Sequence, residues 1–448
     1  MISAPKKSSG KTTLTLGLTA ALTELGKKVR VFKKGPDYID PMWHKAASGH
    51  TCFNIDPFWM DSDLCRRSYL SRCSGMDLCL VEGNHGLHDG LDLQGLNSGG
   101  FLAKLLGIPV LLVVDSAGMN RGVAAIVLGQ QLLDRDVIIS GVVLNNVATT
   151  RQADKQVAAI EHYCGIPVVG TIPRTDKVGI KERHLGLVTV HENPYVKETI
   201  EILAKTISDT CDLDKILTIT HDILPQEDTI YVGKPKTEKK VTIGVAYDKS
   251  FCFYYPDNLQ ALQNEGAELV FFDTLNDTQL PEVDGIYIGG GFPESFLQEL
   301  EQNKTIRAEL ATGIEQGLPV FAECGGLMYL TRSIERNGIK KEMVGAIPAD
   351  VLFQKKPVGK GYTELEVCNK KGWFSFDGTV KGHEFHYSHL INISKEIEFK
   401  FKVTRGTGVN GTHDGIMHKN VLASYTHIHA SVVQTWAKSF VQSVQAYK

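Results

Sequence analysis

The chain has 448 residues, of which 42% are hydrophobic and 22% are charged, and its formal net charge is −3. This length predicts about two or three domains of ordinary globular composition. The nearly balanced charge gives no reason to expect a nucleic-acid partner or an anionic membrane partner. No apolar run approaches the roughly 20 residues that a membrane-spanning helix needs, and the N-terminus lacks the pattern of a secretion signal.

Nine cysteines are scattered along the chain without a C-x-x-C pair. An odd number of cysteines without paired spacing argues against both a disulfide framework and a zinc site. We therefore expect a protein of the reducing cytoplasm.

The first half alternates short apolar runs with helix-length segments, which predicts an α/β domain with a parallel sheet and helices on both faces. Ligands of such sheets bind at the carboxyl ends of the strands. The expected strands span residues 29–33, 77–83, 109–115, 137–147 and 167–173, and the expected helices span 13–26, 95–107 and 120–134.

A polar segment with two prolines and a lysine cluster, HDILPQEDTIYVGKPKTEKK, precedes a second alternating series. We expect residues 1–207 to form the first domain, 208–240 a linker and 241–448 a second α/β domain. The tail from residue 359 onward predicts antiparallel strands and loops. Strands of the second series are expected at 241–248, 268–273, 285–291 and 319–326.

The segment SAPKKSSGKTT is typical of a phosphate-binding loop, in which backbone N–H groups and a lysine hold phosphates and a hydroxyl ligates Mg²⁺. Pro5 stands where the usual pattern has a glycine, and only Met1–Ser3 remain for the preceding strand. A chance Gly-Lys-Thr at a helix start is the alternative, which the following helix and strand disfavour. The residues expected to bind ATP are Gly10, Lys11, Thr12 and Thr13, of which Thr13 should open the helix.

Four carboxylates follow two of the expected strands. Asp37 and Asp40 lie in KKGPDYIDP, and Glu82 and Asp89 lie in VEGNHGLHDG. Carboxylates at strand ends can hold Mg²⁺ between phosphate oxygens or orient an acidic substrate. A single acid of this kind is usually a solvated loop charge, but several at successive strand ends beside a phosphate loop favour a site. We predict Thr12, Asp40 and Glu82 as ligands of Mg²⁺.

Cys324 interrupts the apolar run VFAECGGLMYL and is followed by two glycines. Small residues at a strand-to-helix turn are typical of a nucleophile elbow. The turn would place the thiol at a helix N-terminus, which favours the thiolate. The alternative is a buried structural cysteine, which is the default for the other eight.

A thiolate that attacks an amide needs an oxyanion hole and a base. The backbone of Gly289–Gly291 can supply N–H groups, and we expect Gly290 and Gly291 to stabilise the oxyanion. The segment VLASYTHIHA offers His427 as the base, with His429 as the second candidate. Because the chain has 15 histidines, the residues alone leave His427 no better supported than a packed or solvated histidine.

These segments resemble the cobyrinic acid a,c-diamide synthases, which are glutamine-dependent amidotransferases of corrinoid biosynthesis, from end to end of the chain. The segments that carry the resemblance are APKKSSGKTTLTLGL, FKKGPDYIDP, VEGNHGLHDG, ERHLGLV, IGGGFPES, FAECGGLMYL, GHEFHYS and ASYTHIH. The resemblance implies a P-loop domain of the dethiobiotin-synthetase type, followed by a class I glutaminase domain.

The resemblance also implies a reaction. The glutaminase would release ammonia from glutamine through a thioester on Cys324, with His427 as the base. The synthetase would use ATP and Mg²⁺ to phosphorylate a carboxylate, and ammonia would then displace phosphate to form an amide. In this family the reaction takes place on the a and c acetate side chains of the corrinoid. Asp37 and Asp89 also match the family's motifs.

Two departures keep alternatives open. Class I glutaminases generally carry H-x-E, whereas this chain has His427-Ile428-His429, as the corrinoid branch does, so the partner that orients His427 is unknown. His85 and His88 replace apolar or aromatic residues at the expected substrate rim. They could bind acetates, propionates or a chelated metal, although ordinary loop side chains are the favoured interpretation.

Three alternatives remain open. The substrate could be another tetrapyrrole, namely sirohaem, sirohydrochlorin or nickel-sirohydrochlorin. A partition-type P-loop ATPase is a remote alternative, because such a protein needs neither the thiol turn nor the second domain. A homodimer also remains open, since ammonia could pass within one chain or between two.

Overall fold

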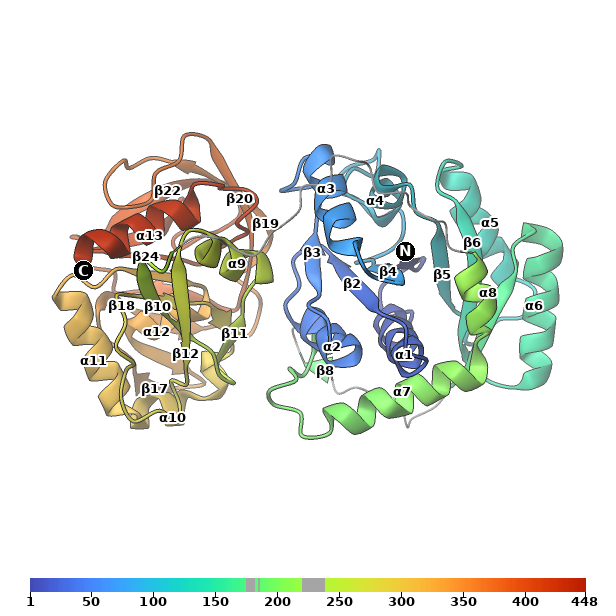
Figure 1. Cartoon of the computed structure of the whole chain (residues 1–448), viewed down its shortest axis with the longest axis horizontal. Helices are drawn as coiled ribbons and strands as arrows, with labels where there is room; N and C mark the ends of the chain where they lie inside the picture. The colour runs from blue at the N-terminus through green and yellow to red at the C-terminus, as the bar shows by residue number, and fades with distance from the viewer. Residues whose placement is uncertain (175–181, 184–185, 220–237) are drawn as a thin grey trace. The chain divides into compact units, whose positions relative to one another are not determined.

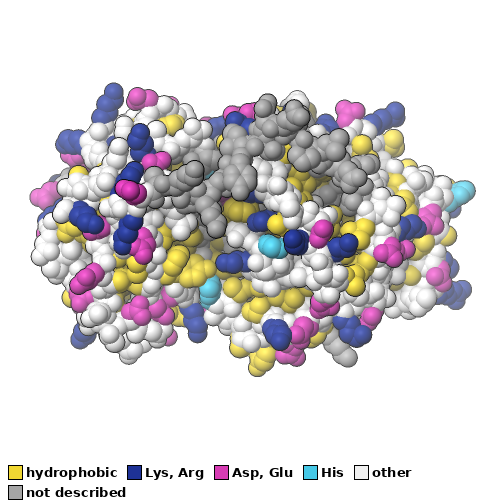
Figure 2. All heavy atoms as spheres, viewed as in Figure 1, with side chains coloured by type: hydrophobic (Ala, Val, Ile, Leu, Met, Phe, Trp, Pro, Cys, Tyr) yellow, Lys and Arg dark blue, Asp and Glu magenta, His cyan; other side chains and the backbone are white. Residues whose placement is uncertain are grey.

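The computed structural model describes residues 1–174, 182–183, 186–219 and 238–448, which form two compact units, Met1–Val232 and Gly233–Lys448 (Figure 1). Both units are α/β, as expected. On the face shown in Figure 2, positively and negatively charged side chains are interspersed. Within the described residues, no helix is both long and apolar enough to cross a membrane.

The first unit is built on a seven-stranded sheet with the order β3-β2-β4-β1-β5-β6-β7, in which neighbouring strands are parallel. The expected strands are all present. The strands are β1 (Ile2–Ser3), β2 (Val29–Lys34), β3 (Phe53–Ile55), β4 (Leu78–Glu82), β5 (Val110–Asp115), β6 (Ile139–Val147) and β7 (Val168–Pro173), and a separate hairpin joins β8 (Glu182–Arg183) to β9 (Gly186–Leu187).

The N-terminal strand is short but central. Although β1 has only two residues, it lies between β4 and β5, and both its residues are buried. Its position brings the phosphate-binding loop to the middle of the sheet's carboxyl edge. The fold therefore accommodates the short strand that the sequence predicts.

Helices accompany the sheet, and several begin at side-chain caps. The Asp61 carboxylate accepts the Leu64 N–H before α3, and the Thr149 hydroxyl accepts the Gln152 N–H before α6. In Figure 1, α7 runs along α1 and α2, which it contacts. The helices are α1 (Lys11–Glu24), α2 (Ile39–Ser48), α3 (Ser62–Cys73), α4 (Gly99–Leu106), α5 (Val123–Leu133), α6 (Thr150–Cys164), α7 (Val196–Thr210) and α8 (Leu213–Thr218).

The expected linker begins too early. Residues 208–219 belong to the first unit, because α7 continues to Thr210 and α8 follows it. Cys211 and Ile216 are buried in the same apolar cluster as Leu14 and Leu18 of α1. This apolar burial explains why the segment folds onto the sheet. Residues 220–237 of the expected linker lie outside the described residues.

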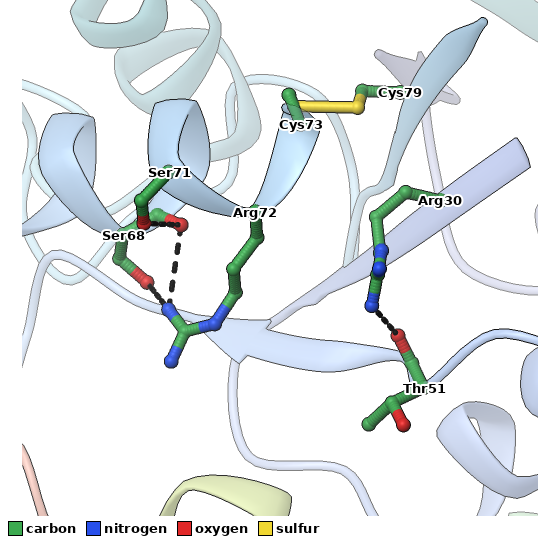
Figure 3. Close-up of a disulfide and its surroundings, with 7 residues drawn as sticks. All are labelled: Arg30, Thr51, Ser68, Ser71, Arg72, Cys73 and Cys79. Atoms are coloured by element: carbon green, nitrogen blue, oxygen red, sulfur yellow. Dashed lines mark hydrogen bonds between the residues drawn. A yellow bond between two sulfur atoms is a disulfide. The ribbon is translucent and has the colours of Figure 1, made fainter. Parts of the chain in front are cut away.

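One pair of cysteines is linked, which the sequence analysis did not predict. The sulfur atoms of Cys73 and Cys79 are bonded to each other (Figure 3). Cys73 ends α3 and Cys79 lies in β4, so the short connection between these elements brings the two Cα atoms to 6.0 Å. That separation lies within the usual range for a disulfide, but the scattered spacing of the cysteines does not indicate it.

The second unit contains a ten-stranded mixed sheet with the order β12-β10-β13-β15-β24-β23-β22-β19-β20-β25. The pairs from β12 to β24 are parallel and the rest are antiparallel, so the expected antiparallel tail completes the same sheet. Its strands are β10 (Val241–Ala246), β12 (Ala267–Phe272), β13 (Gly285–Ile288), β15 (Val320–Glu323), β19 (Gly359–Val367), β20 (Thr379–His386), β22 (Glu398–Arg405), β23 (His413–His418), β24 (Val421–Ser424) and β25 (His427–Ile428).

Two smaller sheets and a set of helices complete this unit. Apolar clusters gather around the central strands, and β13 and β15 contribute residues to both clusters. The small sheets contain β11 (Phe251–Phe253) with β14 (Gly290–Gly291), and β16 (Thr331–Arg336), β17 (Ile339–Glu342), β18 (Ile347–Phe353) and β21 (Ser388–Ile391). The helices are α9 (Pro256–Asn264), the 3₁₀ helix η2 (Pro293–Ser295), α10 (Leu297–Gln302), α11 (Lys304–Glu315), α12 (Gly325–Leu330) and α13 (Trp436–Tyr447).

Candidate active sites

The phosphate-binding loop connects β1 to α1. Gly10 has φ 100°, and a Cβ atom placed on it would lie 2.2 Å from Nδ2 of Asn145. The Asn145 amide donates to the Ser9 carbonyl at 3.0 Å and so braces the loop from β6. Glycine is therefore required at this position by both conformation and space. The helix starts at Lys11, two residues before the expected Thr13.

Lys11 lies across the loop and is buried. Its Nζ atom donates to the carbonyl of His85 at 2.8 Å and to the carbonyl of Lys6 at 3.3 Å. Burial, followed by the neighbouring Lys33 charge, lowers the pKa of Lys11 to about 8. A bound polyphosphate would replace these carbonyls with stronger, negatively charged acceptors.

The three predicted metal ligands come together beside the loop. The Thr12 hydroxyl donates to Oε1 of Glu82 at 2.7 Å and lies 3.3 Å from Oδ2 of Asp40. These are hard oxygen donors of the kind that Mg²⁺ prefers, and they fit a site completed by phosphate oxygens and water. The described residues contain no group of three or more His, Cys, Asp or Glu side chains arranged to hold a metal by themselves.

Two residues of this cluster were missed by sequence reasoning. The Lys33 ammonium donates to Oε1 of Glu82 at 2.7 Å, makes a close ion pair with Asp40 and lies 3.7 Å from Asp37. His44 Nε2 lies 2.5 Å from Oε2 of Glu82. The available signal for Lys33 was its place at the end of an expected strand, within the KKGPDYIDP segment.

Charge and burial shift the pKa values of Glu82, Asp37 and Asp40 in different directions. Burial disfavours a charged Glu82, but the charges of Lys33 and His44 outweigh burial and lower its pKa. Burial, and then the Asp40 charge, raise the pKa of Asp37 to about 7. Burial also raises the pKa of Asp40. Glu82 is therefore the acid of this cluster whose ionised form is most favoured.

The three predicted substrate-side residues after β4 differ in their surroundings. The Asp89 carboxylate accepts the Gly86 N–H at 2.9 Å and is otherwise exposed. His85 is exposed, with φ 53°, and offers its carbonyl to Lys11. His88 Nε2 lies 2.9 Å from the carbonyl of Gln130, which favours a structural role for that ring.

Cys324 occupies the tight turn between β15 and α12. Its backbone has φ 47° and ψ −99°, and its N–H donates to the carbonyl of Ser424 at 2.7 Å. A Cβ atom at Gly326 would lie 2.3 Å from the carbonyl oxygen of Ile288, so the second glycine is needed for close approach. Cys324 is 6% exposed.

The surroundings of the Cys324 thiol act against the thiolate that a helix N-terminus would favour. Burial, together with the charge of Glu294, raises the pKa of Cys324 above its usual value. The helix that follows has only six residues, and its N-terminus does not overcome the loss of water around the sulfur. A thiol of this kind needs an adjacent base to accept its proton as it attacks.

The proposed oxyanion donors lie between the turn and the base. A Cβ atom at Gly290 would be 2.4 Å from Cε1 of His427, so the backbone of Gly290 lies directly against that ring. A Cβ atom at Gly325 would be 3.1 Å from the backbone nitrogen of Gly291. The structure thus brings Gly290 and Gly291 next to both the Cys324 turn and His427.

His427 and His429 have different surroundings. His427 lies in β25 opposite His383 of β20, and their rings stack with centroids 4.8 Å apart. Residues two apart share a face of a regular strand, but β25 ends at Ile428. His429 Nδ1 lies 2.7 Å from the Ser431 hydroxyl, and its Nε2 lies 3.3 Å from Asp257.

His427, the predicted base, lies in a buried environment. Burial, and then the nearby His386, lower the pKa of His427 to about 3. A lowered pKa favours the neutral form of the ring, which is the form that accepts a proton, but it also makes the ring a weaker base. Sequence reasoning missed the stacking partner His383, although GHEFHYS contains it.

Comparisons with known proteins assign both units. Residues 1–188 match the CobQ/CobB/MinD/ParA nucleotide binding domain, and residues 242–434 match the CobB/CobQ-like glutamine amidotransferase domain. The chain therefore combines a nucleotide-binding domain with a glutamine amidotransferase domain, which confirms the expected fold class.

Relatives extend the match over nearly the whole chain. A cobyrinate a,c-diamide synthase of Magnetococcus marinus is 44% identical over 97% of this chain and 95% of the relative. The cobyrinate a,c-diamide synthase of Archaeoglobus fulgidus is 38% identical over 98% of this chain and 96% of the relative. That of Methanosarcina acetivorans is 37% identical over 100% of this chain and 95% of the relative. The chain belongs to the cobyrinate a,c-diamide synthase family, as the sequence motifs predict.

Proposed function

We propose that this protein uses ATP, Mg²⁺ and glutamine to convert the a and c acetate side chains of cobyrinic acid to amides. The observation that carries this proposal is the match to cobyrinate a,c-diamide synthases over nearly the full length of both chains. The same relatives favour a corrinoid over sirohaem, sirohydrochlorin and nickel-sirohydrochlorin. A partition-type ATPase is disfavoured by the amidotransferase domain at residues 242–434.

In the nucleotide-binding unit, the backbone of Gly10 and the side chain of Lys11 would hold the ATP phosphates, with Thr12 and Thr13 in the first turn of the helix behind them. Thr12, Asp40 and Glu82 would hold Mg²⁺, which supplies positive charge to the phosphate oxygens. Asp89 and His85 lie on the loop after β4, where they would border the acidic substrate together with Asp37, whereas His88 would support this loop through its contact with Gln130.

The synthetase reaction would proceed in two displacements. A substrate carboxylate oxygen attacks the γ-phosphorus of ATP, ADP leaves, and an acyl phosphate forms. Ammonia then attacks the acyl carbon, phosphate leaves, and a proton is lost to give the carboxamide. Lys11 is a buried cation beside this reaction centre and would balance the charge that develops on the phosphate oxygens, whereas Lys33 is paired with Asp40 and Glu82.

In the amidotransferase unit, Cys324 Sγ would attack the side-chain amide of glutamine while His427 accepts the thiol proton. The backbone N–H groups of Gly290 and Gly291 would stabilise the oxyanion. His427 then protonates the departing nitrogen, ammonia leaves, and water hydrolyses the thioester to glutamate.

Incubation with ATP, Mg²⁺, glutamine and one tetrapyrrole at a time, followed by mass spectrometry, tests this proposal. Each amidation replaces a hydroxyl with an amino group, so the product mass counts the side chains converted. We expect cobyrinic acid to be converted twice. Conversion of sirohaem or a sirohydrochlorin, with cobyrinic acid unchanged, would replace the corrinoid assignment. Mass measurement of the native protein would test the homodimer.

A further inference from the structure

Glu323, the residue before Cys324, accepts a hydrogen bond from Ile428, the residue after His427. Glu323 directly precedes Cys324, and it is buried to 1% exposure. Its Oε1 atom accepts the backbone N–H of Ile428 at 2.8 Å, and its Oε2 atom accepts the Tyr287 hydroxyl at 2.7 Å. Ile428 directly follows His427, so one carboxylate connects β15 to the strand that carries the base.

A second side chain fixes the other side of Ile428. Asn258 Nδ2 donates to the carbonyl of Ile428 at 2.7 Å, and Asn258 Oδ1 accepts the N–H of Ala430 at 2.7 Å. Because β25 has only two residues, its own pairing with β20 can hold it in few places. Buried side chains therefore help to set where this short strand lies.

We propose that Glu323 is a positioning residue of the glutaminase reaction. Its side chain joins the backbone that follows His427 to the strand end that carries Cys324. This inference rests on the proposed function. The residue at the position of the usual H-x-E glutamate is His429, which is engaged with Asp257 and Ser431. Glu323 acts through the backbone and does not contact the reacting atoms.

The electrostatics indicate which property of Glu323 matters. Burial raises its pKa to about 7, against the lowering effect of the hydrogen bonds from Ile428 and Tyr287. Burial thus works against a full negative charge at this site, whereas the hydrogen bond from the Ile428 N–H needs only an acceptor oxygen. We expect the Ile428 N–H to need an acceptor oxygen at the end of a side chain as long as that of glutamate.

Two conservative variants separate the effect of side-chain length from the effect of charge. Glu323→Gln keeps both the length and an acceptor oxygen, whereas Glu323→Asp keeps the carboxylate but is one methylene shorter. A misplacement of about 1 Å can cost about 100-fold in rate. We expect Glu323→Asp to lower kcat for glutamine hydrolysis by about that factor with little change in KM, and Glu323→Gln to stay within about threefold of the wild type.

Ammonia-dependent amidation of cobyrinic acid by the full chain is the control, because it bypasses Cys324 and His427 and reports a folded synthetase. The inference is overturned if Glu323→Asp hydrolyses glutamine as fast as the wild type, or if Glu323→Gln loses as much activity as Glu323→Asp. If either variant also loses ammonia-dependent activity, a second measurement tests the inference. It is the rate at which a glutamine-like chloroketone alkylates Cys324. That rate should fall in Glu323→Asp alone, and an equal rate in all three proteins overturns the inference. A wild-type chain without glutamine hydrolysis would contradict the proposed function itself.

Discussion

The Nζ atom of Lys33 lies 2.7 Å from Oε1 of Glu82, and both side chains are almost wholly buried. The same ammonium contacts Asp40 and lies 3.7 Å from Asp37, so one cation compensates several acids. Burial disfavours a charged lysine, but these acids raise the pKa of Lys33 well above its usual value. The phosphate-binding edge of the sheet is therefore held together by charge pairing in a place with little water.

Removal of this cation should destabilise the first unit. Breaking a buried pair by deleting one partner costs about 3–5 kcal/mol, because an uncompensated charge remains. We expect Lys33→Met to lower the free energy of unfolding of this unit by that order in a denaturant titration. Lys104→Met is the matched control, since Lys104 and Asp134 are 35% and 31% exposed and such a pair contributes about 0–1 kcal/mol. Equal effects of both variants would contradict a buried charge cluster.

Replacement of the nucleophile should separate the two activities. Cys324→Ala removes the sulfur that forms the thioester, so glutamine-dependent amidation should fall to background while ammonia-dependent amidation stays largely intact. Both rates can be measured on the same preparation. Cys368→Ala, at an exposed cysteine, should leave both unchanged. Equal loss of both activities in Cys324→Ala would count against two separate sites.

Replacement of the loop lysine should have the opposite effect. Lys11→Ala removes the buried ammonium that is expected on the ATP phosphates, so amidation should be lost with glutamine or with ammonia as the nitrogen source. Glutamine hydrolysis should survive at least in part. Lys27→Ala, at an exposed lysine after α1, is the control. Normal amidation by Lys11→Ala would refute the phosphate-binding loop.

The two acids that contact Thr12 should matter to the synthetase. We expect Asp40→Asn and Glu82→Gln each to lower ammonia-dependent kcat by about 100-fold or more, through loss of a metal or transition-state contact. The Mg²⁺ concentration needed for half-maximal rate should rise as well. Rates near those of the wild type would identify these acids as structural charges only.

His427 should make the second unit less stable in acid. Its folded-state pKa of about 3 lies below the value near 6.5 of an unfolded histidine. Between these values the unfolded chain binds a proton that the folded chain does not, so this residue lowers stability as the pH falls through about 6.5. We expect the melting temperature to fall less between about pH 7.5 and pH 5.5 in His427→Gln than in the wild type. Parallel losses in the two proteins would contradict a buried neutral imidazole.

The sequence predicts the elements that follow local rules. Parallel strands end at one edge, so the meeting of Thr12, Asp40 and Glu82 follows from their places at or after the ends of β1, β2 and β4. The turn at Cys324 is predicted because its neighbouring glycines permit a close approach. These features depend on short stretches of chain, and the structure agrees with them.

Contacts made across the fold were not predictable in this way. His44 and Glu323 lie within a helix and a strand, and only tertiary packing reveals that they contact Glu82 and Ile428. The raised pKa of Cys324 was also missed, because burial depends on the surrounding sheet and not on the helix that follows the residue.

Isotope transfer tests the central claim most directly. The full chain is incubated with ATP, Mg²⁺, cobyrinic acid, glutamine labelled with ¹⁵N at the side-chain amide, and unlabelled ammonium in limiting amount. Mass spectrometry then reads the nitrogen isotope of each new carboxamide. The account predicts ¹⁵N in both amides of the product, and Cys324→Ala should incorporate only unlabelled nitrogen. Wild-type product that carries unlabelled nitrogen, or no amide at all, would contradict the transfer of ammonia from the cysteine site to the corrinoid.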